Sequence, residues 1–135
     1  MSVIASGYSA DGEIWHLDAD VDRETGELAT GVGIELADGS RPWGGGCVGP
    51  PVPQGRHIST YSGVADFGPR TFIARVTADV RALVVTLSDG TREDLQLHGD
   101  IRELGARIGV LVYARRLDIH RLDVVGSNGE PLRSD

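Results

Sequence analysis

The residues best suited to chemistry lie in one stretch, RPWGGGCVGPPVPQGRH, at positions 41–57. It contains three consecutive glycines, the only cysteine of the chain, Cys47, and one of four histidines, His57. A cysteine nucleophile needs a base or a positive neighbourhood that lowers the pKa of its thiol. The spacing leaves a Cys47–His57 dyad open, with Arg41 and Arg56 flanking it. The alternative is that Cys47 is a small buried side chain, as free cysteines usually are.

The same glycines do not form a phosphate-binding loop. A P-loop requires G-x-x-x-x-G-K-[ST], and a dinucleotide fingerprint requires G-x-G-x-x-G between a strand and a helix. Here Cys-Val-Gly-Pro-Pro follows the glycines. Proline offers no N–H to a phosphate, and no helix follows to contribute its dipole. The sequence therefore predicts no nucleotide cofactor.

Metal-ligand patterns are incomplete. Asp18, Asp20 and Asp22 match the first acidic positions of a calcium loop, but Arg23 stands where that loop requires glycine. The histidines, which are residues 16, 57, 98 and 120, share no zinc-ligand spacing. We therefore assign no metal ligand. The alternating acids are better explained as the solvated face of a strand.

The bulk composition restricts the classes of partner. The chain has 135 residues and a formal net charge of -7. An acidic protein is poorly suited to nucleic acid or to an anionic membrane surface. No stretch of eighteen apolar residues is present, and the N-terminal residues lack the pattern of a secretory signal. We expect a cytoplasmic protein of one domain, residues 1–135, that binds no nucleic acid and inserts into no membrane.

Turn signals and alternation predict the elements that must position these residues. Asp-Gly or Asn-Gly pairs stand at positions 11–12, 38–39, 89–90 and 128–129, and such pairs favour tight hairpin turns. Apolar residues alternate in segments 13–22, 27–36, 71–77, 81–87, 94–98, 107–115 and 118–125. We expect hairpins of 13–22 with 27–36, of 81–87 with 94–98, and of 107–115 with 118–125. Residues 100–107 are the only candidate for a helical turn.

This organisation predicts an all-β fold. Eight or nine short strands, with at most one short helical turn, are typical of an antiparallel β-sandwich, and we expect an immunoglobulin-like one. In this interpretation the residues between Trp43 and Tyr61 form a long irregular loop, stiffened by its prolines, that joins the N-terminal hairpin to the later strands.

Three features carry a resemblance to a known group: the W-x-L pattern of Trp15 and Leu17, the GGGC segment that ends at Cys47, and VTADVRALVVTLSDG followed by a late Asn-Gly turn. Together they resemble the small β-sandwich proteins of actinobacteria, a group without an established activity. The resemblance implies a fold and no catalytic residue. Several members of that group pair the loop cysteine with a second one, which this chain lacks, so it implies no disulfide here.

The sequence predicts a binding function more readily than catalysis. We expect a non-catalytic module without a cofactor that binds a protein partner or another ligand through the Trp43–Tyr61 segment, with Trp43, Arg56 and Tyr61 as contact residues. An aromatic side chain on a loop is a typical anchor. Two alternatives stay open: an enzyme that uses Cys47 and His57, and a homo-oligomer that covers the apolar strands at 83–87 and 108–114.

Overall fold

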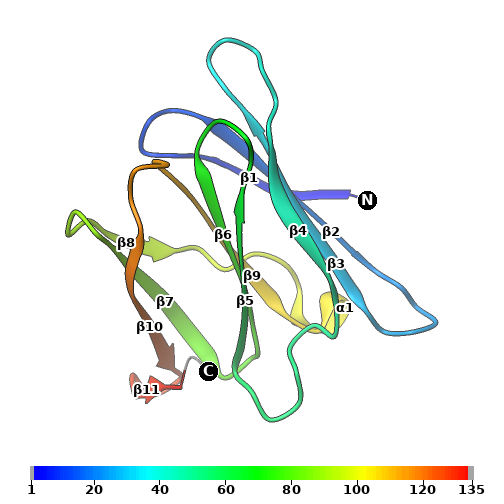
Figure 1. Cartoon of the computed structure of the whole chain (residues 1–135). Coiled ribbons are helices and arrows are strands. Elements are labelled where there is room, and N and C mark those ends of the chain that lie inside the picture. The colour runs from blue at the N-terminus through cyan, green and yellow to red at the C-terminus, as the bar shows by residue number, and fades with distance from the viewer. Residues whose placement is uncertain (1, 134–135) are drawn as a thin grey trace.

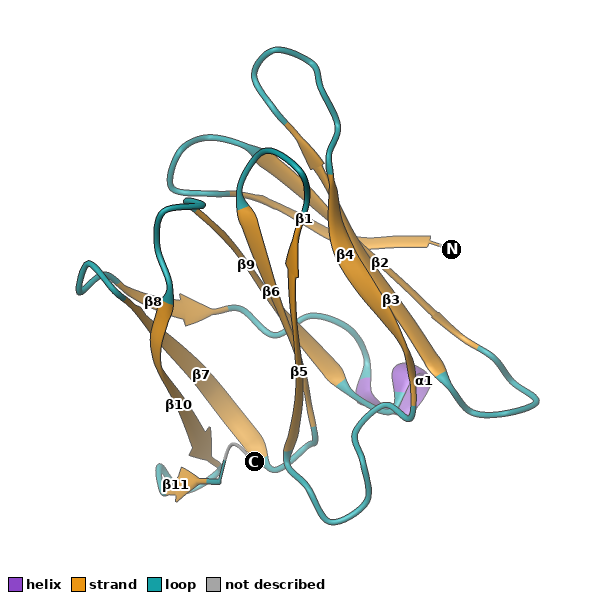
Figure 2. Ribbon diagram, in the orientation of Figure 1, coloured by secondary structure: helices purple, strands orange, loops and turns teal. Residues whose placement is uncertain are grey.

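The computed structural model describes residues 2–133, and nearly all of its regular structure is β-strand (Figures 1 and 2). The chain forms eleven strands and one four-residue helix within these residues. Their bounds are β1 Ser2–Tyr8, β2 Ile14–Val21, β3 Leu28–Glu35, β4 Trp43–Gly49, β5 Ile58–Val64, β6 Arg70–Val76, β7 Val80–Leu87, β8 Arg92–Leu95, α1 Ile101–Leu104, β9 Arg107–Tyr113, β10 Ile119–Gly126 and β11 Pro131–Leu132.

The strands form three antiparallel sheets. The N-terminal sheet has the order β1-β2-β3-β4, the middle sheet β5-β6-β9, and the C-terminal sheet β11-β10-β7-β8. The middle sheet lies between the other two in Figure 1, with β4 beside β5 on one side and β7 and β10 on the other. The predicted all-β antiparallel sandwich is confirmed.

The middle sheet is buried on both of its faces. Phe72 and Val76 of β6 contribute to a core shared with the C-terminal sheet, whereas Ile73 belongs to a second core shared with the N-terminal sheet. Strand β9 divides in the same way, with Leu111 on one side and Val110 on the other. A strand covered on both faces loses the alternation that marks a half-buried strand. The alternation of apolar residues therefore predicts burial only for the face of β6 that carries Phe72, although the opposite face is buried too.

The first predicted hairpin is confirmed. Strands β2 and β3 pair in register from Ile14–Glu35 to Val21–Leu28. Trp15 and Leu17 are buried, and Asp20 on the opposite face is exposed. The glycine of each predicted Asp-Gly or Asn-Gly turn has a positive φ, for example 88° at Gly90. The pairing of β7 with β8 around Gly90 is confirmed as well.

Two parts of the predicted connectivity are wrong. Residues 43–61 are not one irregular loop, because Trp43–Gly49 forms β4 and Ile58–Val64 forms β5, which leaves only residues 50–57 as loop. Glycine lowers local strand propensity, but pairing with β3 from Leu28–Gly49 to Gly33–Trp43 overrides it. Strands β9 and β10 do not pair with each other either: β9 pairs with β6, and β10 pairs with β7.

The predicted helical turn is confirmed as α1. Asp100 caps it by accepting a hydrogen bond from the Arg102 backbone N–H, and Gly105 ends it in the left-handed region. Strands β1, β4, β5 and β11 lie outside the predicted segments and bring the number of strands to eleven, above the eight or nine expected. The immunoglobulin-like arrangement is not confirmed, since that fold has two sheets and these strands form three. Within residues 2–133, no helix has the length and hydrophobicity needed to span a bilayer.

Candidate functional site

The N-terminal and middle sheets meet where their edge strands β4 and β5 run side by side (Figure 1). Glycine backbones make this approach close. A side chain at Gly63 of β5 would overlap the carbonyl oxygen of Gly44, and it would lie 3.3 Å from the Cα of Gly45. A Cβ at Gly44 itself would come within 2.7 Å of the buried Thr71 hydroxyl. The glycines therefore let the two sheet edges touch through their main chains.

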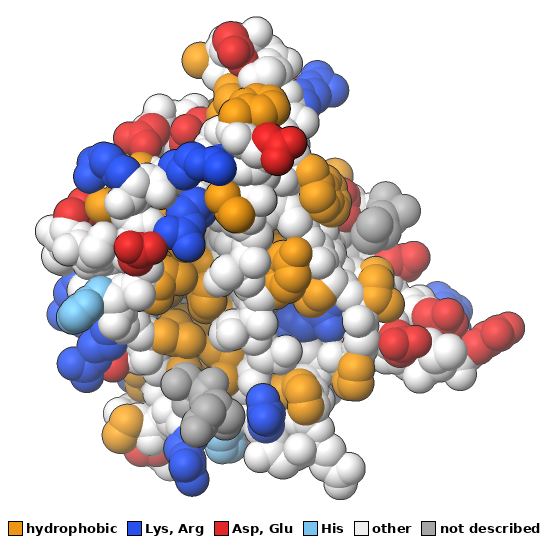
Figure 3. All heavy atoms as spheres, in the orientation of Figure 1, with side chains coloured by type: hydrophobic (Ala, Val, Ile, Leu, Met, Phe, Trp, Pro, Cys, Tyr) orange, Lys and Arg blue, Asp and Glu red, His pale blue; other side chains and the backbone are white. Residues whose placement is uncertain are grey.

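A groove of about 450 Å³ lies above this junction, and we call it the β4–β5 groove. Its floor is the main chain of Gly44, Gly45 and Gly63. Its remaining lining comes from β4 and from the end of β5 with the loop that follows: Pro42, Trp43, Gly46, Tyr61, Val64, Ala65, Asp66 and Phe67. In Figure 3 hydrophobic side chains appear on this face as several separate patches.

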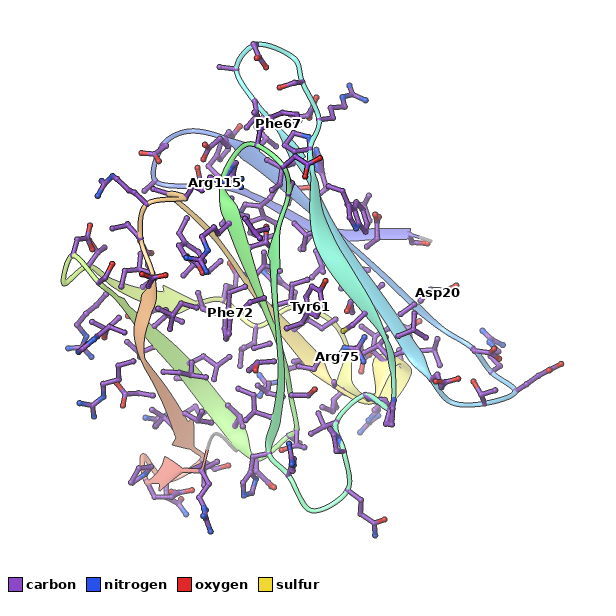
Figure 4. The ribbon with its side chains drawn as sticks, in the orientation of Figure 1. Asp20, Tyr61, Phe67, Phe72, Arg75 and Arg115 are labelled. Carbon is purple, nitrogen blue, oxygen red and sulfur yellow. The ribbon has the colours of Figure 1, made fainter. Side chains whose placement is uncertain are left out.

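Three aromatic side chains in the groove are exposed. Trp43 is 56% accessible, Tyr61 37% and Phe67 51%. Tyr61 lies between β5 and β4 in Figure 4, whereas Phe72 of the adjacent strand lies on the side that faces the C-terminal sheet. The Tyr61 ring covers Gly45, where a Cβ would lie 2.8 Å from Cε1. A soluble domain seldom exposes three aromatic rings around one hollow, and such patches mark binding sites.

The Trp43 indole separates this groove from a second hollow. The tip of its six-membered ring stands over Gly31, where a Cβ would lie 2.5 Å from Cη2. Pro42 and Trp43 line both hollows. The second hollow measures about 390 Å³, and its other lining residues are His16, Gly33, Ile34, Glu35 and Arg41.

A polar relay lies on the outer face of the N-terminal sheet. His16 Nε2 lies 3.2 Å from Glu35 Oε2, and Ser6 Oγ lies 2.7 Å from His16 Nδ1. The hydrogen bond from His16 is the main cause that lowers the pKa of Glu35 below its ordinary value, and Arg41 adds to it from 3.3 Å. The order of groups is that of a serine, a base and an orienting acid. It lies on an open sheet face, however, where His16 and Glu35 are more than a third exposed.

A buried arginine joins the sheets below the groove. Arg75 of β6 is 3% exposed, and its guanidinium donates to the carbonyl oxygens of Leu28 and Cys47 at 2.8 Å. It also donates to the Thr30 hydroxyl at 2.9 Å and to the Pro50 carbonyl at 3.2 Å. Burial lowers the pKa of this guanidinium. Arg75 therefore stabilises β3, β4 and the following loop against the middle sheet, mainly through hydrogen bonds to main-chain oxygens.

The structure brings together two of the three predicted contact residues. Trp43 and Tyr61 line the same groove, but Arg56 lies in the loop at the opposite end of β4 and β5, where its backbone N–H donates to Pro53. The two residues of the predicted dyad have separate polar partners. Cys47 Sγ lies 3.7 Å from the Thr30 hydroxyl, and His57 Nδ1 lies 3.4 Å from Asp79. No hydrogen bond joins Cys47 to His57 within residues 2–133.

Sequence reasoning missed Phe67 and Asp66, which complete the groove, and the relay of Ser6 with Glu35. The signal for the relay is cross-strand register, because Ser6 pairs with His16, and Glu35 stands diagonally across the next strand pair. No comparable signal exists for Phe67, which lies in a connection. Among the described residues, no three His, Cys, Asp or Glu side chains form a group able to hold a metal.

Comparison with known proteins gives no match to this chain, whether with family models, with curated proteins or with solved structures. The resemblance to the small actinobacterial β-sandwich proteins therefore stays a prediction. The function has to be argued from the site, because a sandwich fold supports many functions.

Proposed function

We propose that the protein is a non-catalytic binding module that holds an extended segment of a partner protein in the β4–β5 groove. One observation carries this proposal: Trp43, Tyr61 and Phe67 come from separate segments and expose their rings around one glycine-floored groove. Aromatic anchors in grooves of this kind contribute much of the affinity in peptide recognition. An extended ligand in the groove would lie along the glycine main chain that lines it.

A peptide-display selection on the immobilised protein tests the proposal. Selected peptides are given a fluorescent label and titrated with the protein while the anisotropy of the label is followed, so that variants without Trp43 can be measured in the same way. We expect binding to be lost in Trp43→Leu with Phe67→Leu and kept in Tyr8→Leu, which alters an aromatic side chain on β1 that is even more exposed, at 76%. Peptides that bind the double variant as well as the native protein would contradict the proposal.

The alternatives left open by the sequence have less support. An enzyme that uses Cys47 and His57 would need the two groups to work as a pair, and each has a different polar partner. A homo-oligomer would place a second copy on the exposed apolar surface. Sedimentation equilibrium distinguishes this case, because it measures the molar mass of the protein in solution. If a second copy occupied the β4–β5 groove, a bound peptide would displace it and the molar mass would fall to that of the monomer. The cytoplasmic location stays a prediction from sequence.

A further inference from the structure

The charge in the β4–β5 groove indicates what kind of side chain it receives. Asp66 is the only charged residue in its lining, and it is exposed. The Asp66 carboxylate has no ion-pair or hydrogen-bond partner among residues 2–133. The groove therefore combines one unpaired carboxylate with three exposed aromatic rings.

We propose that the groove accepts an arginine side chain of the bound segment, with its guanidinium among Trp43, Tyr61 and Phe67 and its charge opposite Asp66. This inference rests on the proposed function. An aromatic face attracts a cation through its quadrupole, and guanidinium groups stack on such faces more often than ammonium groups do. A carboxylate at the same place pairs with a guanidinium in the fork geometry that arginine favours.

The second hollow, on the other side of Trp43, is less suited to a cation. Its carboxylate, Glu35, is already paired with Arg41 at 3.3 Å and with His16 at 3.2 Å. Asp66 has no such competitor in the groove. Arg115, in the connection between β9 and β10, donates to the main-chain oxygens of Ala65 and Gly68 and does not line the groove.

The buried cation of this region, Arg75, has its two terminal nitrogens hydrogen-bonded elsewhere, and only its Nε has no partner among the described residues. The donors of Arg75 point to the carbonyl oxygens of Leu28, Cys47 and Pro50. The net charge of -7 attracts a basic segment before contact is made. An arginine thus meets favourable long-range and short-range interactions at the groove.

The test uses two peptides that differ only in charge. Acetyl-Gly-Gly-Arg-Gly-Gly-amide is compared with the same peptide in which citrulline, the neutral isostere of arginine, replaces Arg. Binding is measured on the full chain by chemical-shift changes of the Trp43 indole N–H. We expect the arginine peptide to bind about tenfold tighter than the citrulline peptide at low salt, and the difference to shrink as salt increases.

A matched pair of variants locates the effect. Asp66→Asn is expected to weaken the arginine peptide about three- to tenfold while leaving the citrulline peptide unchanged. Asp20→Asn removes the same charge from an exposed position on β2, away from the groove in Figure 4, and is expected to change neither affinity. Both variants alter exposed side chains, so folding is preserved and can be checked by thermal unfolding.

Equal affinity for the two peptides, or equal effects of the two variants, would overturn the inference. No shift with the arginine peptide up to about 10 mM would also overturn it, since such binding is too weak for an anchor. If display selection still enriched groove-dependent peptides without arginine, the proposed function would stand and only the arginine would be wrong. If no groove-dependent peptide were selected, the proposed function itself would fail.

Discussion

Replacing Gly63 with alanine should separate the two sheet edges at the β4–β5 junction. The added methyl group would overlap the carbonyl oxygen of Gly44, and the obstacle is main chain that cannot rotate away. Restoring an ordinary carbon–oxygen contact requires β4 and β5 to move apart by about 1 Å. Overpacking of this kind costs about 1–3 kcal/mol of folding free energy. For a chain of this length, that corresponds to a fall of about 4–12 °C in Tm.

Gly49→Ala is the matched control, because nothing lies within 4 Å of a Cβ at Gly49 and its φ is not positive. Both substitutions lower the entropy of the unfolded chain by the same amount, so their difference reports the junction alone. We expect Gly49→Ala to be neutral or to stabilise by up to about 1 kcal/mol. Urea unfolding measures both. If Gly63→Ala proved as stable as Gly49→Ala, the close main-chain approach of β4 and β5 would be refuted.

Three further substitutions test other parts of the structure. Arg75→Met should lower the free energy of unfolding by about 3–5 kcal/mol, because it leaves buried carbonyl oxygens without donors, and a loss below about 1 kcal/mol in urea unfolding would contradict this role. Burial beside Trp15 lowers the pKa of His98, so the neutral imidazole is favoured in the folded state. The contribution of His98 to stability is therefore complete above about pH 6.5, the pKa of an unfolded histidine. It is lost as the pH falls below that value, because the unfolded chain then binds the proton more readily. Thermal unfolding between pH 5 and pH 7 should lose this slope in His98→Gln and keep it in the exposed His120→Gln, and an unchanged slope in His98→Gln would disprove the assignment. Asp100→Ala removes the cap of α1 and should cost about 0.5–1 kcal/mol in the same assay, whereas no loss would show that the cap is dispensable.

The sequence was sufficient where a strand is covered on one face and closed by a short turn. Trp15 and Leu17 alternate with polar neighbours because one face of β2 meets the core and the other meets water. Gly90 marks its turn because the positive φ of 88° there suits glycine. One-sided burial and tight turns depend only on residues close together in the sequence, so β2, β3, β7 and β8 were all predicted correctly.

Long-range causes were not visible in the sequence. Strand β4 consists largely of glycine, and only its pairing with β3 makes it a strand. The connection between β9 and β10 is as short as that of a hairpin, yet it crosses from the middle sheet to the C-terminal sheet. The second buried face of β6 could not be recognised from the sequence, because it carries the polar residues Thr71 and Arg75. Both are buried in contact with the main chain of the N-terminal sheet.

The candidate site was also predictable only in part. Trp43 and Tyr61 could be named from residue type, since exposed aromatics in a glycine-rich and proline-rich segment are common anchors. Their shared groove could not be predicted, because it depends on two sheet edges that meet through Gly44 and Gly63. Phe67 joins them only because the connection after β5 folds beside Pro42, where Gly68 approaches the proline ring.

The three layers also differ in how the chain builds them. The N-terminal sheet is one continuous stretch of sequence, whereas β7 and β8 of the C-terminal sheet are inserted between β6 and β9 of the middle sheet. The last two sheets must therefore assemble together, and the first can undock as a separate cooperative unit. Undocking would expose Ile73, Ile108 and Val110 on one face of the middle sheet. The N-terminal sheet thus covers an apolar face of the middle sheet, and we expect conditions that undock it to promote aggregation.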